Sequence, residues 1–285
     1  MSLSETIVLG AIAGFTIYLG LPVGRMHVLS KGTRVFLAMF AVGILAFIFV
    51  DVLAHGFEIV ESAVSDFKDG KGSLATAAGL ALLLMVGFGV GSAGLGFAER
   101  RLRRAQGPPP MAGGSSATDV AALPAHVRAE PSTARTRALQ TGVMIAVANG
   151  LHNFAEGLAI GVSARAGEVS LATVLIIGFA LHNATEGFGI VGPLGDVVPS
   201  WRWLLGVGLI AGGPTLLGSI VGYQVTSEPL ELAFYALAAG AIIYVIGEIW
   251  HAMRRYGYRE LGLLALSVGF SAGVLTDLVV AYGGG

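Results

Sequence analysis

The stretch VFLAMFAVGILAFIFVDVLAHGFEIV, residues 35–60, decides the fold. It carries no charged side chain before Asp51, and similar apolar runs of about 20 residues, the length that crosses roughly 30 Å of hydrocarbon as a helix, recur along the chain. Hydrophobic residues make up 54% of the 285 residues and charged residues only 12%, whereas soluble domains carry roughly 25% charged residues. The mean hydropathy is +0.77. We therefore predict an integral membrane protein.

The apolar runs predict an all-α integral membrane protein with eight transmembrane helices. We place these helices at residues 5–24, 35–60, 74–98, 138–163, 169–191, 203–226, 229–253 and 260–282. The long connection between the third and fourth helices is rich in Pro, Ala, Gly, Ser and Arg, and we predict that it is disordered. The chain thus divides into three helices at 1–98, a loop at 99–137 and five helices at 138–285.

Lysine and arginine fall almost entirely in alternate connections. One side of the membrane receives Arg25, Lys31, Arg34, Arg100, Arg101, Arg103, Arg104, Arg128, Arg135, Arg137, Arg202, Arg254, Arg255 and Arg259. The other side receives Lys68, Lys71 and Arg165. Because cytoplasmic loops carry the excess of basic residues, the long loop is predicted to be cytoplasmic and both termini to lie outside.

The composition also excludes several classes of function. A net charge of −1 gives no global basic field for nucleic acid, so we expect no nucleic-acid partner. The partners we expect are the lipid bilayer and the ions discussed below. The absence of cysteine excludes disulfides and thiolate metal sites. The N-terminus has no basic segment ahead of its apolar run, so it does not read as a cleaved signal peptide. Short loops and the lack of a targeting segment indicate a prokaryotic inner (cell) membrane.

Two consecutive predicted helices carry the same pattern, H-N-x-x-E-G. One copy is HNFAEG at 152–157 and the other is HNATEG at 182–187, so the copies begin 30 residues apart. An ionisable side chain in mid-bilayer costs about 2.5–3.5 kcal/mol, and a chain that keeps several either pairs them or uses them.

Helical spacing places His152 over Glu156, because positions i and i+4 share one face, and likewise His182 over Glu186. Each following asparagine, Asn153 or Asn183, lies about 100° round its helix and can reach the same cavity. Imidazole nitrogen, carboxylate and amide oxygen form a donor set suited to divalent first-row ions. The two copies predict a metal site with four strong ligands, which could also bridge two ions through shared carboxylates. The alternative is a structural role, in which each His–Glu pair is hydrogen-bonded and holds two helices together.

Two further polar clusters fit an entrance and an exit for a metal ion. Asp51, His55 and Glu58 form one stripe at the end of the second predicted helix, and Glu248 and His251 lie at the inner end of the seventh. Each cluster fits equally well a place where a helix leaves the membrane. Asp277 is interpreted as an interfacial, structural residue.

At HNFAEG and HNATEG the sequence resembles the ZIP family of divalent metal transporters (the Zrt-, Irt-like proteins), particularly its smaller prokaryotic members. The resemblance covers the whole layout of eight helices, a long cytoplasmic loop after the third and both ends outside. It implies transport of Zn²⁺, and also of Fe²⁺, Mn²⁺ or Cd²⁺, into the cytoplasm. It further implies a homodimer and an elevator-like motion of the first, fourth, fifth and sixth helices.

The resemblance assigns His152, Glu156, His182 and Glu186 as primary ligands, with Asn153 and Asn183 serving a second metal position. The sequence departs from the family at its sixth helix, where a glutamate before proline is common. This chain has GGPTLLG at 212–218, with Thr215 or a glycine in that place and no carboxylate in the helix. A mononuclear main site fits this departure.

The function we predict is alternating access, in which a hydrated ion enters from outside, loses water and is held by the paired motif. Protons compete with the ion because the ligands are neutral imidazole and ionised carboxylate. No bond-breaking chemistry is required, so we expect no enzyme. The alternatives are an intramembrane zinc hydrolase, a metal-sensing membrane receptor and an exporter of the cation diffusion facilitator type. The exporter type usually has six spans and a folded cytoplasmic domain.

Overall fold

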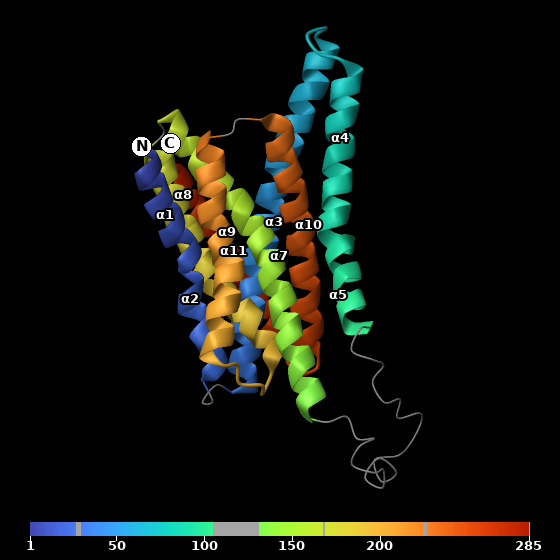
Figure 1. Ribbon diagram of the computed structural model, residues 1–285, viewed down its shortest axis with the longest axis vertical. Coiled ribbons are helices and arrows are strands. Elements are labelled where there is room, and N and C mark those ends of the chain that lie inside the picture. The colour runs from blue at the N-terminus through green and yellow to red at the C-terminus, as the bar shows by residue number, and fades with distance from the viewer. Residues whose placement is uncertain (27–29, 105–130, 168, 225–226, 285) are drawn as a thin grey trace.

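Long helices account for most of the computed structural model, which describes residues 1–26, 30–104, 131–167, 169–224 and 227–284 (Figure 1). No strand occurs within these ranges. The helices in chain order are α1 (Leu3–Phe15), α2 (Ile17–Gly20), η1 (Leu21–Arg25), α3 (Lys31–Lys68), α4 (Leu74–Gly89), η2 (Val90–Gly94), α5 (Leu95–Arg104), α7 (Pro131–Ala166), α8 (Val169–Val191), η3 (Gly192–Leu194), α9 (Trp201–Gln224), α10 (Glu228–Arg254) and α11 (Arg259–Gly284).

Seven of these helical stretches are long and apolar enough to cross a membrane, counting α1–η1 and α4–α5 as one stretch each. That search covers only the described residues, and α8, whose side chains are described only in part, is not among the seven. With α8 as the eighth long helix, the predicted all-α membrane bundle is confirmed.

The predicted boundaries need two corrections. We expected the second helix to end near residue 60, but α3 continues to Lys68. The whole helix has 38 residues and is about 57 Å long at 1.5 Å per residue. Its last turns project beyond the bundle together with the start of α4 (Figure 1), so charged residues such as Glu61 lie on an exposed helix rather than in a loop. The predicted loop at 99–137 is also helical at both ends, in α5 and α7; its remaining residues, 105–130, lie outside the described part.

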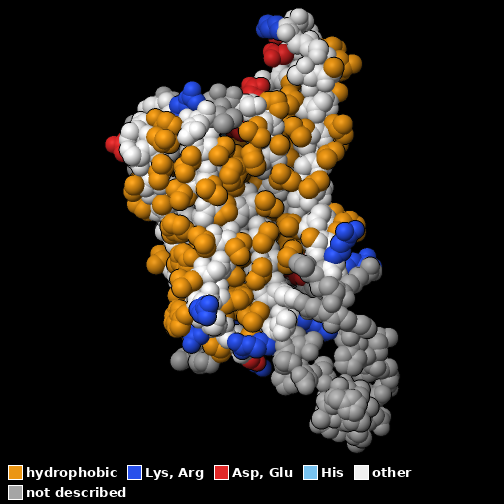
Figure 2. Space-filling view, viewed as in Figure 1, with side chains coloured by type: hydrophobic (Ala, Val, Ile, Leu, Met, Phe, Trp, Pro, Cys, Tyr) orange, Lys and Arg blue, Asp and Glu red, His pale blue; other side chains and the backbone are white. Residues whose placement is uncertain are grey.

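Both chain ends lie at the same end of the bundle, near the start of α8 and the end of α9 (Figure 1). Hydrophobic side chains cover the middle of the face in Figure 2, and Lys and Arg side chains gather mainly at the opposite end from the termini. The position of both chain ends at one end of the bundle fits an even number of crossings.

Backbone-to-backbone contacts at glycine join one set of helices, which we call the motif group: α1, α2, η1, α7, α8 and α9. A Cβ at Gly157 or Gly222 would meet backbone atoms of the facing helix, Thr215 and Leu158 respectively. Gly14 and Gly212 face one another between α1 and α9 in the same way. Small residues let membrane helices approach this closely.

The remaining helices, α3, α4, η2, α5, α10 and α11, form a second set with the same kind of contact, which we call the frame group. Gly43 of α3 abuts the backbone of α11 at Leu266, and Gly269 of α11 abuts Phe40 of α3. Gly240 of α10 abuts Phe88 of α4. Among the described glycines, every one whose Cβ would first meet backbone of another helix makes that contact inside its own group.

The two groups meet through side chains. The rings of Phe154 on α7 and Phe234 on α10 lie 4.5 Å apart between centroids. At the end away from the termini, the guanidinium of Arg255, directly after α10, donates to the carbonyl of Pro193 in η3, at 2.9 Å. The interface between the groups is thus less closely interlocked than either group is internally.

A π-helical segment, η2, interrupts the helix formed by α4 and α5. The hydroxyl of Ser92 in η2 donates to the carbonyl of Phe88 in the last turn of α4. Two turns further on, the buried Glu99 carboxylate accepts a hydrogen bond from the Tyr244 hydroxyl of α10, at 2.9 Å.

The glycine contacts predict an asymmetry between two positions on α9. We expect Gly222→Val to lower the free energy of unfolding by about 1–3 kcal/mol, because the new side chain overlaps the backbone at Leu158. Gly206→Val is the matched control, since nothing lies within 4 Å of a Cβ there. Thermal unfolding of the purified protein in detergent measures both. An equal loss in the two variants would contradict close backbone packing.

Candidate metal site

The two H-N-x-x-E-G copies lie in the middle of α7 and α8, inside the motif group. His152 and Glu186 are 0% and 1% exposed, and Glu156 is 3% exposed. Burial of this kind removes the water that would otherwise solvate an imidazole or a carboxylate. The side chains therefore need partners within the protein or a ligand.

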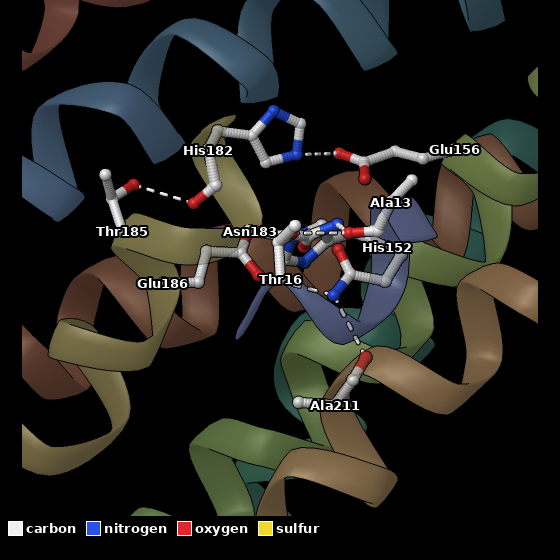
Figure 3. Close-up of polar contacts among 10 residues, drawn as sticks. Ala13, Thr16, His152, Glu156, His182, Asn183, Thr185, Glu186 and Ala211 are labelled. Carbon is white, nitrogen blue, oxygen red and sulfur yellow. Dashed lines mark hydrogen bonds and ion pairs between the residues drawn. The ribbon is translucent and has the colours of Figure 1, made fainter. Parts of the chain in front are cut away.

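One motif histidine pairs with the glutamate of the other copy. His152 Nε2 lies 2.6 Å from Glu186 Oε1, a hydrogen bond between α7 and α8 (Figure 3). A nitrogen and a carboxylate oxygen at this distance share a proton. A metal ion that takes both ligands has to replace that proton.

The reciprocal pair joins His182 of α8 to Glu156 of α7. Their Nε2 and Oε1 atoms lie 2.7 Å apart, but the angles are not those of a hydrogen bond, so this is a close ion-pair contact (Figure 3). The His182 side chain is 11% exposed, the most open of the four. The two motif copies thus exchange partners across the helix pair.

This arrangement differs from the predicted four-ligand centre. The residues come together as two separate cross-helix pairs. Among the described residues, no three His, Asp or Glu side chains converge where one ion could sit. The spacing correctly indicated which side chains face the core, but pairing between helices, rather than along each helix, depends on how α7 and α8 pack.

The motif asparagines bind neighbouring backbone and carboxylate groups. Asn153 donates through Nδ2 to Ala211 O at 2.9 Å and to Glu186 Oε2 at 3.3 Å. Asn183 donates through Nδ2 to Ala13 O at 3.2 Å. Each amide nitrogen is therefore used, and each amide oxygen is free to accept or to bind a cation.

Several buried polar atoms around the pairs have no hydrogen-bond partner among the described residues. They are His152 Nδ1, Asn153 Oδ1, Glu156 Oε2, Asn183 Oδ1, Thr215 Oγ1 and both side-chain polar atoms of Asn149. Buried polar groups are rarely left unpaired, so this concentration of nitrogen and oxygen donors points to a polar ligand, an ion or water. Asn149 escaped the sequence analysis because it lies outside the repeated pattern, although it is one turn before His152 on the same face.

A cavity of about 500 Å³ reaches the second pair from the end where the termini lie. Glu156 and His182 line its inner part, and Asp51 and His55 of α3 line its outer part. The cavity lies between the motif and frame groups, since α10 and α11 supply its other walls. It offers a path from the end of the bundle that holds the termini to the motif residues.

The predicted entrance residues divide in two. Asp51 and His55 line the cavity and lie 3.9 Å apart between Oδ1 and Nδ1, whereas Glu58 is exposed and outside it. The predicted exit residues are at the other end of the bundle: Glu248 is half-buried and His251 is exposed. Neither lines this cavity.

Two cavity carboxylates were missed. Asp277 of α11 lines the cavity, although the sequence analysis interpreted it as interfacial, and Glu231 of α10 lines it with its Oε1 bonded to the Tyr235 hydroxyl at 3.0 Å. Neither belongs to a recurring motif. Only the packing of α10 and α11 against α3 brings them to the cavity.

These features define a helical membrane protein with a buried His, Glu and Asn donor set. A profile described as the ZIP zinc transporter matches residues 103–246, half of the chain. The chain belongs to the ZIP zinc transporter family and is a divalent metal transporter. A comparison with curated proteins returns no matching relative. The resemblance seen in the paired motif is confirmed.

The donor set predicts how Zn²⁺ binding responds to loss of one carboxylate. We expect Glu186→Gln to weaken Zn²⁺ binding at least tenfold, about 1.4 kcal/mol, because an ionised ligand becomes a neutral amide of the same shape. Isothermal titration calorimetry in detergent measures this. Glu260→Gln, at an exposed glutamate of α11, is the control. Unchanged affinity in Glu186→Gln would remove Glu186 from the site.

Proposed function

We propose that this transporter moves Zn²⁺ into the cytoplasm by alternating access through the two cross-helix pairs of α7 and α8. The observation that carries the proposal is the cavity, which links acidic residues at the outer end of the bundle to Glu156 and His182. A carboxylate-lined vestibule attracts cations, and the donors at its inner end suit a borderline divalent ion.

The charge of the loops supports the proposed direction of transport. The Lys- and Arg-rich end of the bundle is assigned to the cytoplasm, so the cavity opens to the outside. At the cytoplasmic end, the contact from Arg255 to the Pro193 carbonyl ties the two helix groups together. A cavity that opens to the outside, together with a contact that closes the cytoplasmic end, is the arrangement of a carrier in its outward-open state.

Binding requires the two pairs to separate and regroup. An incoming ion replaces the proton held between His152 and Glu186 and draws in Glu156 and His182, whose contact is already outside hydrogen-bond geometry. The free amide oxygens of Asn153 and Asn183 accept hydrogen bonds from the waters that remain on the ion. Both histidines bind as neutral imidazoles.

Charge balance favours one ion at this centre. Glu156 and Glu186 together carry −2, which matches one divalent ion, and the neighbouring polar groups Asn153, Asn183 and Thr215 are neutral. A second divalent ion would leave two uncompensated positive charges in a buried site, which is strongly unfavourable.

The division into two helix groups supports an elevator-like step. The motif group carries both motif copies and corresponds to the helices that the family resemblance expects to move. Its internal contacts are backbone against backbone, whereas its contacts with the frame group are made by side chains such as Phe154 and Phe234. Sliding between the groups therefore leaves the motif geometry intact.

The remaining parts of the proposal concern metals and context. The nitrogen and oxygen donors also accept Fe²⁺, Mn²⁺ or Cd²⁺, because such sites select by geometry more than by ligand type. The protein is proposed to act as a homodimer in a prokaryotic inner membrane with both termini outside. Of the alternatives, a hydrolase would hold a resident zinc, and a receptor would bind the ion without passing it.

Zn²⁺ uptake into proteoliposomes tests the proposal. We expect saturable uptake by the wild type and none above background by Glu186→Ala, since that change removes one of two balancing carboxylates. Glu260→Ala is the matched control and should transport normally. Competition by Fe²⁺, Mn²⁺ and Cd²⁺ then ranks the substrates.

The alternatives give different results in the same assay. Tight Zn²⁺ binding without uptake would identify a receptor or an enzyme. Neither binding nor uptake with any of the four metals would leave the two His–Glu pairs as structural locks.

The charge argument predicts a stoichiometry of one ion per chain at the motif centre. Metal analysis after equilibrium dialysis counts the bound Zn²⁺, and the Asp51→Asn/Glu231→Gln/Asp277→Asn background removes the carboxylates that could hold ions in the outer cavity. We expect about one ion there, because one divalent ion already neutralises both carboxylates. Two tightly held ions in that background would contradict the charge balance.

A further inference from the structure

A second cavity, of about 520 Å³, lies at the opposite end of the bundle, between α3, α10 and α11. The turn from α10 to α11 forms its rim, with Arg254 on one side and Arg259 on the other. It shares no lining residue with the cavity that reaches the motif histidines. Nothing in the transport scheme uses it.

The rim is positively charged and unsatisfied. Arg254 and Arg259 are both exposed, and neither side chain has a hydrogen bond or ion pair with any described residue. This contrasts with the adjacent Arg255, which binds the Pro193 carbonyl. Two free guanidinium groups at one cavity mouth match a phosphate group, which accepts from planar donors.

The floor of the cavity is apolar. Val35 and Met39 of α3, Met253 of α10 and Leu263 of α11 line it. Gly262 leaves room at its centre, since a Cβ there would lie 3.5 Å from Met39 Cγ. An inorganic anion gains nothing from contact with apolar side chains, whereas an acyl chain packs against them.

Aromatic side chains mark the cavity as interfacial. Trp250 and Tyr258 line it and are 38% and 44% exposed. Trp and Tyr side chains with this partial exposure concentrate at the level of lipid headgroups. The cavity therefore combines a phosphate-binding rim, a headgroup-level aromatic pair and an apolar slot.

We propose that this cavity binds one anionic phospholipid, with its phosphate on Arg254 and Arg259 and an acyl chain along the floor formed by Val35, Met39 and Leu263. Basic pockets between helices on the cytoplasmic side recognise anionic headgroups in this way. The proposal needs membrane insertion and not the metal site, so its failure would leave zinc transport untouched.

Native mass spectrometry of the full-length protein tests this with equimolar phosphatidylglycerol and phosphatidylcholine. We expect the wild type to retain phosphatidylglycerol with a preference of about tenfold and Arg254→Gln/Arg259→Gln to show none. Arg202→Gln, at an exposed arginine of the same end outside the cavity, is the control and should keep the preference. Equal losses in the control and the double variant, or no preference in the wild type, would overturn the proposal.

A second variant separates a lipid from a free anion. Gly262→Leu fills the floor and leaves both arginines, so it should also lose phosphatidylglycerol while eluting as a folded protein in size-exclusion chromatography. Inorganic phosphate should not compete with the lipid in the wild type. Full competition by phosphate, or normal lipid retention in Gly262→Leu, would identify an anion site without an acyl-chain slot and would refute the lipid proposal.

Discussion

The packing of the helices around the motif depends on the contact between His152 and Glu186. Two ionisable side chains at the centre of a membrane bundle are tolerable only if they satisfy each other or a ligand. Exchange of partners between α7 and α8 achieves this and brings the two helices into register at the motif. The same exchange keeps His152, Glu156 and Glu186 buried inside the bundle.

Enclosure of that centre depends on glycine at the helix crossings. Gly157 and Gly222 bring α7 and α9 to backbone contact, and Gly14 with Gly212 does the same for α1 and α9. Between the same two helices, α7 and α9, the Asn153 amide reaches the Ala211 carbonyl. Close packing and polar chemistry are thus two aspects of one arrangement.

Periodicity predicted the helices well and the pairing poorly. Apolar runs of membrane length are a property of each segment, so the eight helices could be read directly, and the repeated motif marked the buried residues. The partner of His152 could not be read, because it depends on the rotation of α8 relative to α7. That Asp277 lines the cavity could not be read either, because only tertiary packing brings α11 to the cavity. The length of α3 was missed because charged residues such as Glu61 are equally typical of a loop and of an exposed helix.

The π-helical segment at Val90–Gly94 has a consequence for the far end of its helix. A π-turn takes up one residue more than an α-turn, and each residue advances the helix by about 100°. The surplus residue therefore rotates every later side chain about the helix axis, and this rotation turns Glu99 toward the Tyr244 hydroxyl. With a regular α-helix, the same sequence would point that carboxylate about a quarter-turn away from α10. The irregular segment thereby keeps the Glu99 carboxylate within hydrogen-bond reach of α10.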